Sequence, residues 1–381
     1  MKKLMYALIF ILLFIMASCS VNTEPSSNNQ EVNTNGSVSK EPLIMETEKY
    51  TVDKVEFAIS NFEPINVGWF DDENIAVVMT NHSLENPPSK LMERIYVYNL
   101  KNKHYTLIAE GEFFGYNWHI NFKKLLDGNF LLEGSRMALE IESGPFNFKG
   151  NLPYPEGAYE GDISHNKTQL VYNKKEGLYL HTLNSTSSKD AELYKYDDEE
   201  EIVPSSPAWS FDDKNIGYIL FNRLDLSLNE VVILDPIIQK QKSYIVGESA
   251  PYGWWFQDNM RFVTYSSGIG VPIIKVIDTS KDQVQEYEKT GSIVITCPPH
   301  GDQVLYIHID RGAESGYLMD RIVSFNVLTN TSDIVTPDFL NIRSSSFSPT
   351  GNQVLFIANS NPGEELSIYV ARRKTNIILN N

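Results

Sequence analysis

Residues 209–220 read WSFDDKNIGYIL, and residues 347–358 read FSPTGNQVLFIA. Both stretches begin with an aromatic residue, continue through a polar turn and end in an apolar run. Similar stretches begin at Ile163, Trp255 and Cys297, and looser copies begin at Gly68 and, with one inserted residue, at Phe122. We look for such self-similarity first, because a repeat determines the whole fold.

Each copy is followed by further segments that have the composition of strands. The second runs are IYVYNL from Ile95, MALEI from Met137, LYLHTL from Leu178, EVVIL from Glu230, PIIKVI from Pro272, RIVSF from Arg321 and LSIYVA from Leu366. A third, weaker run follows in five copies, as in HYTLIA from His104 and KSYIVG from Lys242. Short β-branched and aromatic runs bounded by Asn, Asp, Gly and Pro predict strands. Units spaced by about 40 to 55 residues with several strands each predict an all-β fold, a β-propeller of four-stranded blades with seven repeat units.

The last copy carries a family resemblance. Residues 347–372 resemble the TolB-like, PD40-type propeller repeat through Phe347, Ser348, Pro349, Gly351 and the Ile368-Tyr369-Val370 strand, and Trp209, Ser210 and Asp212 match the same pattern. The chain is also similar to YqgU-type lipoproteins of Gram-positive bacilli, a resemblance that implies a six-bladed propeller as the alternative to seven. The segment YTVDKVEFAI at residues 50–59 is a candidate closing strand for the last blade.

The N-terminal region predicts export and lipidation. Residues 1–18 read MKKLMYALIFILLFIMAS, with two lysines, an apolar run too short for a comfortable membrane span and small residues at the end, as in a signal peptide. Cys19 follows and resembles the lipidated cysteine of bacterial lipoproteins, where a diacylated residue would give stable membrane attachment. Residues 19–47 are rich in Ser, Asn, Thr and Glu and predict a flexible tether, so residues 48–381 are expected to form the propeller.

Charge and cysteine content exclude several classes of function. The net charge of −17 disfavours binding to nucleic acid or to anionic lipid headgroups. The acidic run at residues 197–201 lacks the Gly and the alternating oxygen ligands of a calcium loop, so we expect a solvated loop there. Once Cys19 is acylated only Cys297 remains, so no intrachain disulfide is expected and stability has to come from the apolar core.

The repeat gives structural roles to several chemically suggestive residues. Cys297 takes the position of an aromatic residue, which favours a buried hydrophobe over a reactive thiol, and His165 and His300 fall in the polar turn. His308 and Asp310 would share one strand face, but no third metal ligand is identifiable. Asp212 and Asp213 are expected in a tight turn, which Asp favours through side-chain to backbone hydrogen bonds. We therefore assign no catalytic, cofactor-binding or metal-binding residue, and no cofactor.

Two functions remain open. The first is a lipid-anchored, extracytoplasmic module of the cell envelope that binds a protein or a glycan through one face, as the TolB-like resemblance implies. Trp254 is a candidate anchor: if Trp255 is in the core, Trp254 either faces the partner or packs on the neighbouring blade. The alternative is a carbohydrate-active glycosidase or lyase with carboxylates around the central channel, for which Asp162, Asp310 and Glu314 are candidates.

Overall fold

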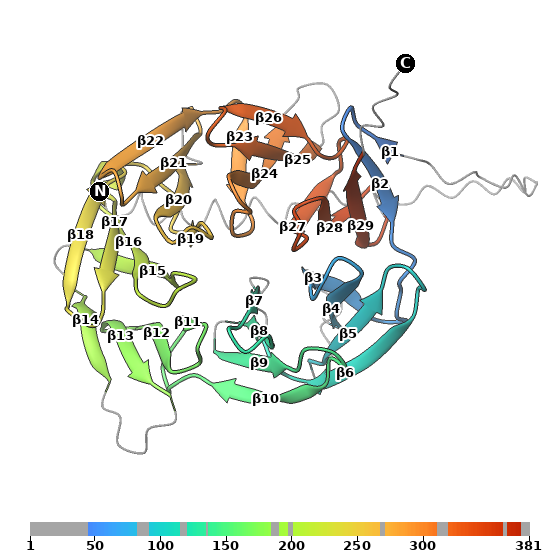
Figure 1. The fold of residues 1–381 in the computed structure, drawn as a ribbon, viewed down its shortest axis with the longest axis horizontal. Helices are drawn as coiled ribbons and strands as arrows, with labels where there is room; N and C mark the ends of the chain where they lie inside the picture. Colours follow the sequence, from blue (N-terminus) through green and yellow to red (C-terminus); the bar gives the residue numbers. More distant parts are fainter. Residues whose placement is uncertain are drawn as a thin grey trace, which may run out of the picture. The chain divides into compact units, whose positions relative to one another are not determined.

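The computed structural model describes residues 45–81, 91–114, 120–134, 136–183, 190–196, 201–266, 271–310, 319–360 and 364–374. These residues form seven antiparallel sheets that follow one another around a ring (Figure 1). The fold is therefore a seven-bladed β-propeller, which confirms the predicted class and repeat count, and the six-bladed alternative is wrong. Cys19, residues 197–200 and Glu314 lie outside the described residues.

The blades are consecutive in sequence, and within each blade the chain runs from the inner strand to the outer strand. Blade 1 contains β3 (Glu63–Trp69), β4 (Asn74–Thr80), β5 (Glu93–Asn99) and β6 (Tyr105–Gly111), and blade 2 contains β7 (Asn121–Lys124), β8 (Phe130–Glu133), β9 (Met137–Ile141) and β10 (Phe148–Pro153). Blade 3 contains β11 (Glu160–Ile163), β12 (Gln169–Lys174), β13 (Gly177–Thr182) and β14 (Ala191–Lys195), and blade 4 contains β15 (Ile202–Trp209), β16 (Ile216–Asn222), β17 (Glu230–Asp235) and β18 (Lys240–Ile245).

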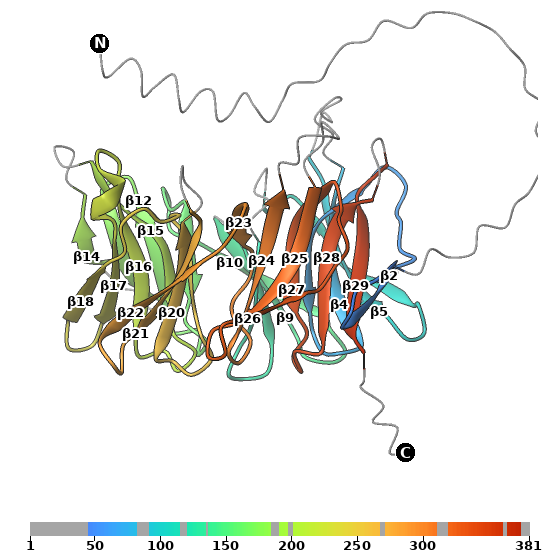
Figure 2. The same ribbon diagram turned by 90° about the horizontal axis from the view of Figure 1, so that it is seen from above.

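The remaining blades repeat this arrangement. Blade 5 contains β19 (Gly253–Trp255), β20 (Arg261–Ser266), β21 (Ile273–Asp278) and β22 (Gln283–Glu288), and blade 6 contains β23 (Ser292–Ile295), β24 (Gln303–Asp310), β25 (Met319–Asn326) and β26 (Thr331–Ile334). Blade 7 contains β27 (Asn341–Phe347), β28 (Gln353–Asn359) and β29 (Ser367–Arg373). Figure 2 shows the strands of the ring running between its two faces. The described part of the chain contains a short 3-10 turn, η1 (Leu226–Leu228), and no helix of the length and apolarity of a membrane span.

The N-terminal strand closes the ring, as the sequence predicts. β2 (Tyr50–Lys54) pairs antiparallel with β29, with Tyr50 opposite Arg373, and β1 (Met45–Glu46) pairs with β2 (Figure 1). Tyr50 is fully buried in the core between blades 6 and 7. The two ends of the described chain therefore lie in one sheet, which removes the exposed edges that an open ring would leave.

Strand pairing shows where each repeat copy begins, and in blades 1 and 2 that position differs from the one predicted from the sequence. The last residue of the inner strand is paired with the residue seven positions later, as in the pairs Trp209 with Ile216 and Phe347 with Val354. In blade 1 this position belongs to Trp69 rather than Gly68, and in blade 2 it belongs to Lys124 rather than Phe122. The turns of these two blades are shorter by one residue than those of the other copies.

Phe122 has a different role in the core. Its ring lies 5.1 Å from the ring of Phe70 and 5.6 Å from that of Phe130, within the cluster shared by blades 1 and 2. A Cβ at Gly68 would come within 2.5 Å of the Phe122 ring, so a glycine is required for this contact. Phe122, which the sequence places at the start of a repeat copy, thus packs against blade 1.

Two tryptophans of the repeat, Trp69 and Trp255, join neighbouring blades by hydrogen bonds as well as by apolar contact, whereas the buried Nε1 of Trp209 has no partner in the described structure. Trp255 Nε1 donates to the carbonyl of Ala208 at 2.9 Å, and Trp69 Nε1 donates to the carbonyl of Ser346 at 3.2 Å. In both cases the acceptor lies on the inner strand of the preceding blade. A buried indole thereby satisfies its N–H while its ring fills the space between two sheets.

Candidate functional site: the central channel

The seven inner strands surround a central channel with a volume of about 1570 Å³, and side chains from all seven blades line it. We call the end where the inner strands begin the connection face, and the end where they finish the turn face. The lining includes Glu160, Ser206, Tyr252, Trp254 and Arg343. Typical small-molecule sites have volumes of roughly 300 to 1,000 Å³, so this channel has room for a sizeable ligand group.

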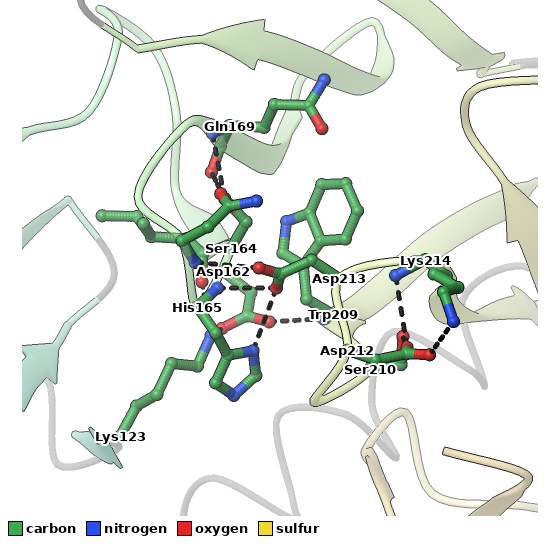
Figure 3. A network of polar contacts seen from close by, with 12 residues as sticks. Lys123, Asp162, Ser164, His165, Gln169, Trp209, Ser210, Asp212, Asp213 and Lys214 are labelled. Atoms are coloured by element: carbon green, nitrogen blue, oxygen red, sulfur yellow. Dashed lines mark hydrogen bonds and ion pairs between the residues drawn. The ribbon is translucent and has the colours of Figure 1, made fainter. Parts of the chain in front are cut away.

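A buried ionic cluster joins blades 2 and 3 at the channel wall. Lys123 Nζ forms an ion pair with Asp162 (Figure 3) and donates to the carbonyl of Ile163 at 2.5 Å. It also lies 3.6 Å from Glu133 Oε2. Asp162 Oδ2 also accepts the N–H of Trp209, on the inner strand of blade 4, at 2.5 Å. Asp162 therefore connects three successive blades.

The protonation of this cluster follows from its burial and its charge. Burial raises the pKa of Glu133, and the attraction of Lys123 offsets only part of this effect. The carboxylates of Asp162 and Glu133 raise the pKa of Lys123 against the opposing effect of burial. Lys123 therefore stays charged in its ion pair with Asp162, beside a Glu133 that takes up a proton more easily than an exposed glutamate.

Glu133 is poorly placed for chemistry on a ligand. Its side chain is 1% exposed, and its Oε1 accepts the N–H of Ile163 at 2.8 Å. The hydroxyl of Tyr154 is buried and makes no hydrogen bond in the described structure, and burial, followed by the charges of Glu133 and Asp162, raises its pKa. The cluster thus joins blades 2, 3 and 4 by buried interactions, and its carboxylates expose almost no surface to the channel.

A second carboxylate, Glu160, lies two residues before Asp162 on β11 and faces the channel near the connection face. Its Oε2 accepts Asn173 Nδ2 at 2.9 Å and the N–H of Ser206 at 3.2 Å. Ser206 lies in a bulge of β15, where the pairing with β16 skips from Ser205 to Ala208, and its φ of 51° is in the left-handed region. The bulge turns a backbone N–H away from the sheet, and Glu160 supplies its acceptor.

The bulge also contacts blade 5. Ser205 Oγ donates to the carbonyl of Pro251 at 2.9 Å, and Ser206 Oγ accepts the N–H of Gly253 at 3.4 Å. Glu160, the bulge and the start of β19 therefore form one continuous wall across blades 3, 4 and 5. Burial raises the pKa of Glu160, and its two hydrogen bonds oppose that change.

The predicted turn at Asp212 and Asp213 has an additional role in joining blades. Asp213 Oδ1 accepts the N–H of His165 at 2.7 Å and lies 3.1 Å from its Nδ1, and Asp213 Oδ2 accepts the N–H of Asn166 at 2.8 Å (Figure 3). Asp212 accepts within its own turn, from the Ser210 hydroxyl at 2.8 Å. Asp213 has a φ of 56°, a conformation that Asp and Asn tolerate better than most residues.

The same contact recurs at other blade interfaces on the turn face. Asn259, at the position of Asp213 in blade 5, has a φ of 60° and accepts the N–H of Asp212 at 3.0 Å. At the closing interface, Asp72 of blade 1 accepts the hydroxyl of Thr350 of blade 7 at 2.8 Å. At these three interfaces, between blades 3 and 4, 4 and 5, and 7 and 1, a side chain of one turn therefore accepts a hydrogen bond from the turn of the preceding blade.

Trp254 and Trp255 have different environments. Trp255 is buried between blades 4 and 5, whereas Trp254 is partly buried, packs against the cluster between blades 5 and 6, and also lines the channel. Trp254 thus contributes both to the packing between blades 5 and 6 and to the channel wall.

The other candidates from the sequence take structural positions. Cys297 lies in the core of blades 6 and 7, where burial raises the pKa of its thiol to about 12. The ring of His300 lies 5.7 Å from that of Phe347, and burial lowers the pKa of its imidazole. Asp310 Oδ2 lies 3.6 Å from Arg321 Nη2, and burial lowers the pKa of His308. Within the described ranges, no group of three His, Cys, Asp or Glu side chains is arranged to hold a metal ion.

Lys123, Glu133 and Glu160 are not among the residues predicted from the sequence. A usable signal was present for Glu133, since it ends the buried strand FLLE at Phe130–Glu133, where a charged residue requires a partner. Lys123 stands in a short inner strand between Phe122 and Lys124, and nothing in that pattern distinguishes it from a surface lysine. Its role depends on Asp162, which only the ring brings close.

No protein-family model matches this sequence, and no curated protein matches it. Among solved structures, the chain is similar to an oligogalacturonate lyase from Vibrio parahaemolyticus, with a TM-score of 0.59 and 12% identity over 87% of this chain and 96% of that one. It is also similar to an oligogalacturonate lyase in complex with manganese, with a TM-score of 0.57 and 13% identity over 87% and 95% of the two chains. TolB from Acinetobacter baumannii has a TM-score of 0.42 and 14% identity over 78% and 80%. At these identities the two lyases share the propeller fold with this chain.

Proposed function

We propose that this protein is a lipid-anchored, extracytoplasmic binding module of the cell envelope, and that its ligand enters the central channel. One observation carries the proposal: a channel of about 1570 Å³ whose walls combine partly buried aromatic and polar side chains from every blade. Concave sites with aromatic walls and a few placed polar groups are the usual form of ligand sites. The ligand is a group of an envelope protein or of a glycan.

The geometry gives less support to a glycosidase or lyase. Such an enzyme needs two carboxyl groups that both reach the substrate, one of them with a raised pKa. Glu133 has the raised pKa but is enclosed, and its neighbour Asp162 is held by Lys123 and by the Trp209 N–H. Both residues line the channel, but their side chains are only 1% and 7% exposed, so they present little surface to a ligand.

Site-specific photo-crosslinking in intact cells tests the proposal. Tyr159 lines the channel and is 42% exposed, so p-benzoylphenylalanine fits in its place, and Ile245 on the outer strand of blade 4 gives a matched position that is 68% exposed. We expect a discrete light-dependent adduct from position 159 and none from position 245. Equal adducts at both positions, or none at either, would overturn binding in the channel.

The anchor has a separate test. Cys19→Ala removes the residue that we expect to be acylated, so the protein should be released into the medium or remain unprocessed. A second variant, Cys297→Ala, changes the buried cysteine and should stay with the membrane fraction like the wild type. Unchanged membrane retention of Cys19→Ala would refute lipid anchoring and leave the channel proposal intact.

A further inference from the structure

Two carboxylates on β11 differ in their electrostatic compensation. Asp162 has Lys123 as a counter-ion. Glu160 accepts from two neutral donors, Asn173 Nδ2 and Ser206 N–H, and among the described residues no ion pair reaches it. A partly buried carboxylate without a counter-ion is costly, and proteins either neutralise it or pair it.

Glu160 lines the channel, and its hydrogen bonds fix its side chain. Both described hydrogen bonds use Oε2, so the carboxylate is held in orientation and its other oxygen, Oε1, has no hydrogen bond among those described. The residue is neither enclosed like Glu133 nor free to move like a surface glutamate. A rigid carboxylate oxygen at a cavity wall is suited to a charge-assisted hydrogen bond with a ligand donor.

The surroundings of Glu160 favour an organic cation over a metal ion. Tyr159 and Tyr252 also line the channel; burial raises the pKa of both phenols, and the nearby carboxylate of Glu160 raises it further. Aromatic rings attract ammonium and guanidinium groups through their π faces, whereas Ca²⁺ and Mg²⁺ require several oxygen ligands. Arg223 lies near Tyr159 but forms no ion pair with Glu160 in the described structure.

We propose that Glu160, with Tyr159 and Tyr252, forms a subsite for an alkylammonium group of the ligand, such as a lysine side chain or an amino group on a glycan. The net charge of −17 attracts such a cation to the protein. The subsite rests on the proposed function, because it lies inside the channel that receives the ligand. It specifies that the part of the ligand bound there is positively charged.

Ligand-observed NMR with 1,5-diaminopentane as the probe and 1,5-pentanediol as its neutral analogue tests the subsite. We expect saturable binding of the diamine and none of the diol. Glu160→Gln keeps an acceptor for Ser206 but loses the charge, so it should weaken diamine binding by about tenfold or more, the size of one charge-assisted hydrogen bond. The control Glu288→Gln removes the same charge from an exposed position on the outer strand β22 and should change binding by less than about twofold.

The outcomes separate the subsite from the function. If the diol binds as tightly as the diamine, the cation subsite is wrong. It is also wrong if Glu160→Gln and Glu288→Gln bind the diamine with equal affinity. If p-benzoylphenylalanine at position 159 forms its adduct in cells, but neither excess diamine nor the additional change Glu160→Gln reduces that adduct, the subsite is wrong while channel binding stands. If no adduct forms at all, channel binding fails, and the NMR titration still decides whether Glu160 takes a cation.

Discussion

Asp162 and Glu160 stand two residues apart on one strand, yet the molecule uses them differently. Asp162 is paired with Lys123 and accepts a backbone N–H from the next blade, so all its interactions are internal. Both residues line the channel, but Glu160 is fixed by two neutral donors and has no ion pair among the described residues. The comparison teaches that charge in an inner strand has two uses in this propeller: fastening blades together and facing the cavity. The presence of a counter-ion distinguishes them.

Removing the counter-ion should have the largest effect on stability. Lys123→Met leaves Asp162 and Glu133 buried without a cation, and breaking a buried ion pair from one side costs about 3 to 5 kcal/mol. Chemical denaturation of the purified protein measures the loss. Lys124→Met is the matched control, because Lys124 is exposed and lies only over the Phe130 ring, so we expect less than about 1 kcal/mol. Equal small losses in both variants would mean that the cluster contributes little to stability.

The two carboxylates can be compared directly by amide substitution. Asp162→Asn removes the closest anion from Lys123, and ionisation of Glu133 compensates only in part, so we expect a loss of about 2 kcal/mol. Glu160→Gln keeps an acceptor for Ser206 and Asn173 and removes a charge without a partner, so the change should stay within about 0.5 kcal/mol. The comparison is made by measuring the free energy of unfolding of the Asp162→Asn and Glu160→Gln variants. A larger loss for Glu160→Gln would reverse the assignment of internal and cavity-facing roles.

The raised pKa of Glu133 predicts a dependence of stability on pH. The folded state holds the Glu133 proton more tightly than the unfolded chain does, so between the unfolded pKa and the raised folded pKa the native protein binds more protons. The stabilising contribution of Glu133 is therefore present at acidic pH and is lost as pH rises through the folded pKa, by at most about 1.4 kcal/mol per pH unit.

Glu133→Gln should flatten this dependence, since Gln keeps an acceptor for the Ile163 N–H and does not titrate. Melting temperatures measured at intervals from acidic to alkaline pH, with Glu288→Gln as the control of equal charge change, provide the comparison. Parallel curves for the wild type and Glu133→Gln would show that Glu133 titrates normally in the folded protein.

The sequence was sufficient for the fold because the signal is local. Each copy combines an aromatic residue, a turn and an apolar strand within about a dozen residues, and such patterns survive without alignment. The closing strand at Tyr50 was also predictable, because it is an alternating segment without a blade of its own. β10 was missed since its Gly150-Asn151-Leu152-Pro153 sequence has the composition of a turn, although it pairs with β9.

The contacts in the channel wall were less predictable, because they join side chains of different blades that come together only in the assembled ring. Lys123 and Asp162 belong to different blades, and no spacing rule links them. Glu160 and Asp162 have the same charge and lie on the same face of one strand, so the sequence pattern does not distinguish their roles. The difference between them depends on which side chain of another blade is near, and that is a property of the assembled ring.

Asp213 provides the smallest and most specific test, on the turn that first indicated the repeat. Asp213→Asn should cost only about 0.5 kcal/mol, because Asn tolerates the left-handed backbone and Asn259 makes the corresponding contact in blade 5. Asp213→Ala has no acceptor for the N–H groups of His165 and Asn166 and should cost about 2 kcal/mol. Denaturation of the two variants measures the difference. If Asp213→Asn and Asp213→Ala lose similar free energies of unfolding, the negative charge of Asp213 beside His165 is needed. Asp213 would then resemble Asp162, which has a specific charged partner, and an uncharged acceptor could not replace it.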